Sequence, residues 1–311
     1  MAKIEVQNFT KDYGHGRGVF DISFEINEGE IYGFLGPNGA GKSTTIRHLM
    51  GFSRPDSGRT KILGLDSFEN YDKFMDKVGY IPGEIALPEG LNGYEFIQMM
   101  KSLRKVKDDR LISRLLDMFE VDPSGETKRM SFGVKRKLAI ITAFMHDPEI
   151  LILDEPTSGL DIAMQQVFIE LLKEEKKRGK TILLSSHTFS EVDATCDRIA
   201  IIKDGKIVSE FVANDLKHKD NKNYFVQFGS KSDLVKFLDE NKDNGHFTIV
   251  SQEEDSLIIN IDDKNINYLI SAISKSNIKS FSHLKETLED YFMKYYKEDR
   301  DFGGAIKWKQ S

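Results

Sequence analysis

The fold of this chain is decided by the stretch Gly36-Pro37-Asn38-Gly39-Ala40-Gly41-Lys42-Ser43-Thr44. An apolar run precedes the stretch and a helical pattern follows it, which is the setting of a phosphate-binding loop. The glycines let the backbone curl so that successive N–H groups face phosphate oxygens, and the helix adds its positive N-terminal end. Lys42 supplies a cation for the β- and γ-phosphates, and the Ser43 hydroxyl is a hard oxygen ligand for Mg²⁺. The stretch therefore predicts a nucleoside triphosphate site formed by residues 36–44.

Apolar runs alternate with helical patterns around this site. Near-continuous apolar runs, typical of parallel strands buried on both faces, occur at 31–35, 150–153 and 181–184. A helical pattern follows each run, and this alternation indicates an α/β sheet. Residues 4–9 and 20–26 instead alternate polar with apolar side chains, which predicts half-buried antiparallel strands.

We therefore expect an α/β fold with a P-loop NTPase core of mainly parallel sheet. An antiparallel β subdomain and a helical lobe at about residues 84–145 complete a first domain over residues 1–213. Residues 214–223 are polar and charged, and we interpret them as a linker. Residues 224–311 are expected to form a small α+β accessory domain, with strands at 224–228, 247–251 and 256–261 and helices at 231–240, 265–274 and 284–296.

Composition excludes several classes of protein. The chain has 311 residues, enough for two domains, and its 44 basic and 50 acidic residues give a net charge of −6. A general nucleic-acid binder would need a basic face, so no nucleic acid is expected as a partner. The single cysteine, Cys196, excludes a disulfide scaffold and a Cys-rich metal site. With no leader-like N-terminus and no apolar run near the roughly 20 residues that span a bilayer, we expect a cytoplasmic protein whose membrane role would depend on a partner.

Further polar residues follow two of the apolar runs. Asp154 and Glu155 end the run at 150–153, which places one carboxylate near the Mg²⁺ shell and a second where it can polarise an attacking water. The turn Ser158-Gly159-Leu160-Asp161 follows, with Asp161 as the N-cap of a long helix. His187 comes directly after another core strand, at the edge of the sheet where phosphates bind.

In this order and spacing, the motifs resemble those of the ATP-binding cassette (ABC) family of transport ATPases, over about residues 1–210. The segment Met130–Lys137 resembles the family's signature, usually Leu-Ser-Gly-Gly-Gln followed by basic residues. The resemblance implies that Ser131 and Gly133 face the γ-phosphate of ATP held by a second copy of the ATPase. A GTPase is not supported, because no Asn-Lys-x-Asp guanine-binding motif follows.

The resemblance also implies roles for single residues. Glu155, His187 and Lys42 are the expected catalytic residues, and Ser43 and Asp154 are the expected metal ligands. Cofactors would be ATP and Mg²⁺. The partners implied are an integral-membrane permease and a second copy of this chain, which places the protein at the inner face of the cell membrane.

Two further assignments leave alternatives open. Tyr13 occupies the position of the family's adenine-stacking aromatic residue, and the alternative is a core tyrosine at a strand end. Asp161 either reaches across the dimer to the opposite P-loop or only caps its helix, and both roles are compatible.

Two departures from the family pattern stand out. Phe132 and Val134 replace the first glycine and the glutamine of the signature, and similar replacements occur in the branch of bacterial exporters of drugs or peptides. Gly83 stands where the family typically has a Mg²⁺-contacting glutamine; either Glu84 reaches the metal shell, directly or through water, or the contact is absent.

The expected function is the ATPase subunit of an exporter that drives a separate permease. Residues 84–104 resemble the lobe that receives the permease's cytoplasmic helices, and residues 287–296 resemble the closing helix of exporter ATPases. The alternatives are a soluble cassette ATPase that acts on ribosomes or DNA, and the ATPase of an importer. The first usually has two cassettes or a coiled-coil insertion, and this chain has neither.

Overall fold

A computed structural model describes residues 2–217, 221–242, 244–284 and 287–297. The chain divides into two compact units, Met1–Ala213 and Asn214–Ser311. Because each unit has its own core, the two are described separately.

The first unit is built on a six-stranded sheet whose order is β10-β9-β3-β8-β7-β6. All of its pairs are parallel except the edge pair β9/β10. In chain order, the strands are β3 (Ile31–Leu35), β6 (Val78–Ile81), β7 (Ile150–Asp154), β8 (Thr181–Ser186), β9 (Arg198–Lys203) and β10 (Lys206–Val212). Every residue of β3, β7 and β8 is buried, as expected for parallel strands covered on both faces.

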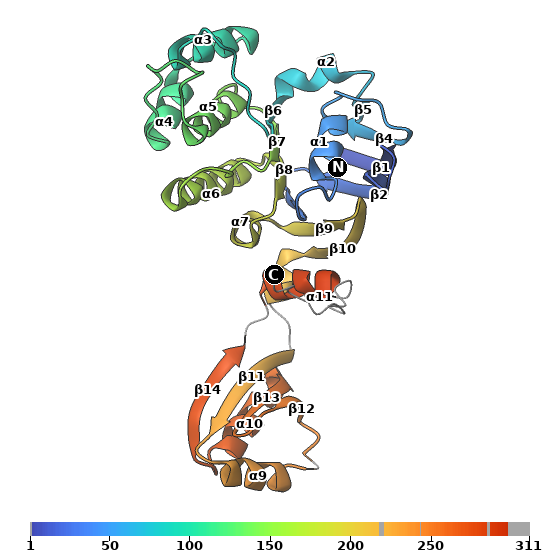
Figure 1. The fold of residues 1–311 in the computed structure, drawn as a ribbon, viewed down its shortest axis with the longest axis vertical. Coiled ribbons are helices and arrows are strands. Elements are labelled where there is room, and N and C mark those ends of the chain that lie inside the picture. Colours follow the sequence, from blue (N-terminus) through green and yellow to red (C-terminus); the bar gives the residue numbers. More distant parts are fainter. Residues whose placement is uncertain (1, 218–220, 243, 285–286, 298–311) are drawn as a thin grey trace, which may run out of the picture. The chain divides into compact units, whose positions relative to one another are not determined.

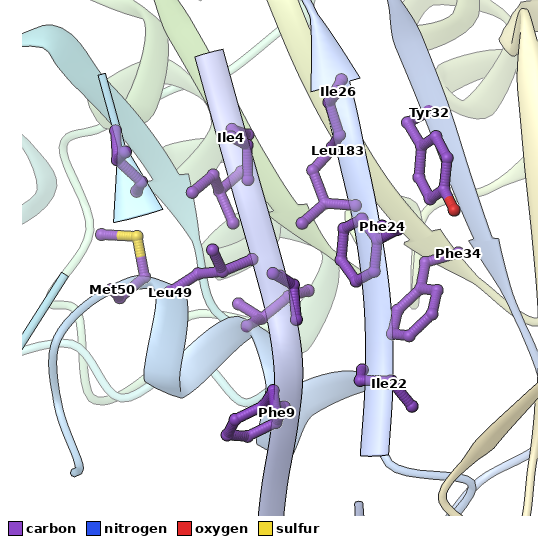
Figure 2. Close-up of a cluster of buried hydrophobic side chains, with 14 of the residues drawn as sticks. Ile4, Phe9, Ile22, Phe24, Ile26, Tyr32, Phe34, Leu49, Met50 and Leu183 are labelled. Carbon is purple, nitrogen blue, oxygen red and sulfur yellow. The ribbon is translucent and has the colours of Figure 1, made fainter. Parts of the chain in front are cut away.

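A second, antiparallel sheet has the order β2-β1-β4-β5. Its strands are β1 (Ala2–Asp12), β2 (Gly18–Asn27), β4 (Ser57–Ile62) and β5 (Leu65–Asp66). Helix α1 (Lys42–Leu49) packs between the two sheets, where it contacts β2, β4 and β7. Figure 2 shows the resulting core, in which Phe24 of β2 lies beside Tyr32 and Phe34 of β3 with ring centroids 5.2 and 5.5 Å apart.

Helices cover the other face of the six-stranded sheet (Figure 1). They are α5 (Phe132–Phe144), α6 (Ile162–Lys177) and α7 (Phe189–Thr195). With α5, helices α3 (Gly93–Leu103) and α4 (Arg110–Met118) form the helical lobe, and the short α2 (Tyr71–Phe74) and η1 (Met75–Lys77) precede β6. Asn92 and Glu95 form a capping box that starts α3. The expected α/β fold with an antiparallel subdomain and a helical lobe is confirmed.

The second unit has the element order βαββαβ, the split-βαβ arrangement. Its sheet order is β12-β13-β11-β14, all antiparallel. The elements are β11 (Asn221–Phe228), α9 (Lys231–Glu240), β12 (Phe247–Gln252), β13 (Ser256–Asp262), η2 (Asp263–Asn265), α10 (Ile266–Ile273) and β14 (Ile278–Leu284). Its core includes Val226, Phe237 and Ile259.

The second unit differs from the sequence-based expectation at two places. The stretch 214–223, interpreted as a linker, contains most of α8 (Ala213–Lys217) and the start of β11. Polar residues extend β11 because they find cross-strand partners: Lys222 pairs with Asp263 and Asn223 with Asn260. Strand β14 was not expected, and since it takes up Leu284, the following helix α11 (Leu288–Lys297) begins later than residue 284. Within the described part of the chain, no helix is long and apolar enough to cross a bilayer.

Candidate functional site

The predicted phosphate-binding loop connects β3 to α1. Pro37, Asn38 and Gly39 are exposed at its tip, whereas Gly36 and residues 40–42 are buried. Gly41 has a φ of +112°, and a β-carbon there would lie 2.8 Å from the side chain of Val19, so only glycine fits. Ser43 and Thr44 follow in the first turn of α1, half-buried, at the positive end of the helix.

Lys42 points back into this loop. Its Nζ donates hydrogen bonds to the carbonyl oxygens of Gly36 (2.6 Å) and Pro37 (3.2 Å). The same atom forms an ion pair with Oε1 of Glu155, at 3.0 Å, and the lysine side chain is only 6% exposed. Three groups therefore fix the ammonium group at the mouth of the loop.

Glu155 follows the last residue of β7 and has an unusual backbone conformation. Its φ is +50°, in the left-handed region that non-glycine residues seldom adopt. Its N–H donates to the backbone oxygen of Ser185 at 3.1 Å, which holds the turn against β8. Strained backbone of this kind is concentrated at functional sites.

His187 completes the cluster. Its Nδ1 lies 2.6 Å from Oε2 of Glu155, within hydrogen-bond distance, and its ring is about half exposed. The two oxygens of Glu155 thus face two different partners, Lys42 and His187. The three residues expected to be catalytic come together at the carboxyl end of the parallel strands.

Asp154 and Ser43 converge at a second point of the site. The Asp154 carboxylate is buried and accepts a hydrogen bond from the hydroxyl of Ser185 through Oδ1. A β-carbon at Gly83 would lie 2.9 Å from Oδ2 of Asp154 and 3.7 Å from Oγ of Ser43. Position 83 therefore faces the predicted metal ligands, which is where the resemblance places the family's metal-contacting glutamine. Because the residue here is glycine, it offers no side chain to the metal.

The signature segment begins the helical lobe's longest helix. Ser131 is the N-cap of α5, and its hydroxyl accepts a hydrogen bond from the N–H of Val134 at 3.3 Å. Gly133 lies in the first turn, where a β-carbon would be 3.0 Å from the carbonyl oxygen of Gly159. This helix N-terminus thus lies beside the turn that follows Glu155, with Ser131 exposed to solvent.

The sequence leaves two possible roles open for both Tyr13 and Asp161, and the structure bears on each residue differently. Tyr13 is 56% exposed, which excludes the interpretation as a core tyrosine. Nζ of Lys11 lies 5.8 Å from the centroid of its ring, and stacking on a base stays a prediction. Asp161 caps α6, because its carboxylate accepts a hydrogen bond from the N–H of Met164 at 2.9 Å. That bond confirms the capping role and leaves the contact across a dimer as a prediction.

Sequence reasoning missed two residues beside the site. Ser185 bonds Asp154, and Glu191 of α7 accepts a hydrogen bond from Ser186, the residue before His187, at 2.6 Å. Burial raises the pKa of Glu191 to about 7, with a further contribution from the negative charge of Glu155. The sequence did contain a signal for these contacts, because Ser185 and Ser186 end an apolar strand and buried hydroxyl groups need hydrogen-bond partners.

The phosphate-binding loop, the adjacent carboxylates of Asp154 and Glu155, and His187 are the features of a P-loop ATPase. The helical lobe is an addition to that core. Comparison with known sequences narrows this class: the pattern of the family described as ABC transporter matches residues 19–158. The chain is 32% identical to the ABC transporter ATP-binding protein YhcH of Bacillus subtilis (strain 168), over 96% of this chain and 97% of that protein. It is 31% identical to the bacitracin transport ATP-binding protein BcrA of Bacillus licheniformis, over 94% and 96%.

Solved structures agree with this result. A structure described as the ATP-binding subunit of an ABC transporter superposes with a TM-score of 0.64 at 29% identity, covering 69% of this chain and 91% of that one. A dimeric cassette bound to ADP and Pi shares the fold, with a TM-score of 0.61. The chain belongs to the ABC transporter family. It is an ATP-binding, ATP-hydrolysing subunit, as expected from the motifs.

Proposed function

We propose that this subunit powers the export of a drug, an antimicrobial compound or a peptide through a separate permease at the inner face of the cell membrane. The proposal is supported by full-length similarity to a bacitracin transport protein and by 36% identity, over 68% of this chain, to the linearmycin resistance ATP-binding protein LnrL of Bacillus subtilis (strain 168). The signature departures at Phe132 and Val134 agree with it.

One observation carries the assignment of the chemistry: Glu155 lies between Lys42, at 3.0 Å, and His187, at 2.6 Å. In this arrangement the carboxylate polarises the water that attacks the γ-phosphate in line and takes its proton. Lys42 neutralises charge on the phosphates, and His187 holds Glu155 in place and contacts the phosphate being released. The products are ADP and inorganic phosphate.

The oxygens of Ser43 and Asp154 fit a magnesium ion. Both groups face position 83, and one carboxylate with one hydroxyl suits a cation that keeps most of its waters and shares phosphate oxygens. When bound, Mg²⁺ would neutralise charge on the β- and γ-phosphates. Ser43 would bind it directly and Asp154 through water.

Two copies of the chain complete each site. Ser131 and Gly133 present a hydroxyl, a close-approaching backbone and a helix N-terminus, which are the groups that bind the end of a triphosphate. Ser131 is exposed, and within the described part of the chain its hydrogen bonds are with N–H groups of α5, so its position is accessible to a second copy. ATP drives closure because its γ-phosphate binds better in the closed dimer than in the open one.

A cation-rich cleft of about 600 Å³ adjoins Arg104, the last residue of the 84–104 stretch expected to receive the permease, and we propose that it extends the docking surface of that stretch. The cleft lies between α3, α4 and the ends of α5 and α6. Six basic residues and two acidic ones, Asp108 and Asp147, line it. The basic residues are Arg104, Lys105, Lys107, Arg110, Arg114 and Arg178. Arg110, Arg114 and Arg178 pair with Asp108, Glu174 and Asp147. The excess of positive charge is therefore carried by Arg104, Lys105 and Lys107, and it fits an acidic cytoplasmic segment of the permease.

Purification from detergent-solubilised membranes tests the transport function. We expect a multi-spanning membrane protein to co-purify with the tagged chain and to stimulate its ATPase activity when the transported compound is added. Recovery of ribosomal particles or DNA without a membrane protein would support the soluble alternative, and stimulation by a substrate-binding protein would support an importer.

A further inference from the structure

The largest fully buried side chain in the described part of the molecule is that of Arg136, on α5. The side chain is 0% exposed, and among the residues described it forms no direct ion pair, although the negative charges of Asp154 and Glu155 act on it at longer range. Burial of a charge without a counter-ion is costly. A basic residue one turn into the signature helix would ordinarily point to water, so the burial requires a reason in the surroundings.

Three backbone carbonyl groups satisfy this guanidinium. Nη1 donates to Pro82 at 2.8 Å, Nη2 to Gly83 at 2.7 Å and Nε to Ser158 at 3.2 Å. The first two acceptors lie in the loop after β6, and the third lies in the turn after β7. One side chain of the helical lobe therefore binds two loops of the nucleotide-binding core.

Both loops belong to the ATPase site. Gly83 faces Asp154 and Ser43, since a β-carbon there would be 2.9 Å from the carboxylate and 3.7 Å from the hydroxyl. Ser158 donates its N–H to the carbonyl oxygen of Glu155 at 3.1 Å, so its turn is bonded directly to the catalytic residue. A movement of Arg136 would therefore be transmitted to the carboxylates of both Asp154 and Glu155.

Phe132 strengthens the same connection. The centre of the Arg136 guanidinium lies 5.2 Å from the centroid of the Phe132 ring, a cation–π contact. The ring also lies over Gly159, where a β-carbon would be 2.2 Å from a ring carbon. The departure from the signature at position 132 thus attaches the N-terminus of α5 to the turn that contains Ser158.

We propose that Arg136 is a positioning residue that joins the signature helix to the nucleotide site, at the place where the family's metal-contacting glutamine is missing. Because the guanidinium holds α5, residues 82–83 and the 158–159 turn together, Ser131 and Gly133 keep a fixed position relative to the ATP bound in the same chain. Closure on a second copy then depends on Arg136, while ATP binding by one copy does not. This inference rests on the proposed two-copy site.

The test compares Arg136→Gln with Arg129→Gln, which removes the same charge from an exposed side chain that pairs with Glu126 on the lobe surface. ATP affinity is measured by equilibrium binding to single copies. ATP-dependent dimerisation is measured in the Glu155→Gln background, and kcat and KM in the active background. We expect Arg136→Gln to weaken dimerisation and lower kcat by about tenfold each, because it breaks charge-assisted bonds to two loops, with single-copy ATP affinity within about twofold of the control.

A second variant keeps the test decisive if Arg136→Gln fails to fold. Arg136→Lys retains the charge, but its single nitrogen cannot span the carbonyl groups of both loops, so we expect a smaller loss of dimerisation in the same direction. Dimerisation and kcat equal to those of Arg129→Gln in both variants would overturn the proposal. Failure of the Glu155→Gln protein itself to dimerise with ATP would instead overturn the two-copy site, so the two failures are distinguishable.

Discussion

Lys42 and Glu155 form an ion pair inside the nucleotide site, with 3.0 Å between Nζ and Oε1. The side chains are 6% and 15% exposed, so solvent screens the pair weakly. Lys42 is also bonded to the carbonyl oxygens of Gly36 and Pro37, and Glu155 to His187. The residue expected to bind phosphate and the residue expected to activate water therefore orient each other within one network.

Glu155→Gln should abolish turnover and keep ATP binding. The amide cannot accept the proton of the attacking water, so kcat should fall at least about 100-fold. ATP should bind at least as tightly, because Lys42 no longer shares its charge with a carboxylate. Steady-state hydrolysis and equilibrium binding measure the two effects. Glu149→Gln is the control, since Glu149 pairs with Lys77 on the surface. Turnover above half that of the parent protein would remove Glu155 from the catalytic role.

Glu191 should make the stability of the first unit depend on pH. Its pKa is about 7 in the folded chain, compared with 4.5 for an ordinary glutamate, so between these values only the folded chain keeps the proton. The stabilisation is fully present below about pH 4.5 and is lost as the pH rises through 7, with a total on the order of 3 kcal/mol.

Urea unfolding at pH 5, 6, 7 and 8 measures this effect in the parent chain and in Glu191→Gln. Because glutamine does not titrate, the free energy of unfolding of Glu191→Gln should rise relative to the parent as the pH increases. Glu69→Gln is the control, because Glu69 is exposed and pairs with the exposed Arg54. A constant difference between Glu191→Gln and the parent across this range would contradict the assignment.

Charge reversal in the cation-rich cleft should separate the subunit from its membrane partner. The double variant Lys105→Glu/Lys107→Glu should weaken permease co-purification by at least about tenfold, and the loss should be largest at low ionic strength. Lys173→Glu/Lys177→Glu, which reverses two charges on α6, is the control. Equal recovery of the permease with both double variants would show that the cleft is not the docking surface.

The convergence of the residues expected to be catalytic could be predicted from the sequence, because Lys42 lies in the phosphate-binding loop and Glu155 and His187 each directly follow a buried parallel strand. The carboxyl ends of such strands meet at one edge of the sheet, so Lys42, Glu155 and His187 converge there without further information. Their spacing along the chain is characteristic, and the resemblance to a known family added the roles.

Other features depend on contacts that the sequence does not display. From the sequence alone, Arg136 would be interpreted as a basic residue exposed to solvent. It is buried because it donates hydrogen bonds to carbonyl groups more than 20 residues away on either side, at positions 82, 83 and 158. No residue of strand β14 is buried, so its apolar alternation is weak, and the strand forms because β11 offers an edge for pairing. Polar residues 221–223 likewise join β11 through cross-strand partners.

Mixing two inactive variants tests the two-copy site most directly. Ser131→Arg keeps its own Glu155 and blocks the site of its partner, whereas Glu155→Gln keeps Ser131 and cannot hydrolyse its own ATP. A mixed dimer therefore contains one intact site, and an equimolar mixture should recover up to about a quarter of the parent's ATPase activity, since half of the dimers are mixed and half of their sites are intact. If activity instead stays at the mean of the two separate variants, each copy hydrolyses ATP alone and the account of a shared site is wrong.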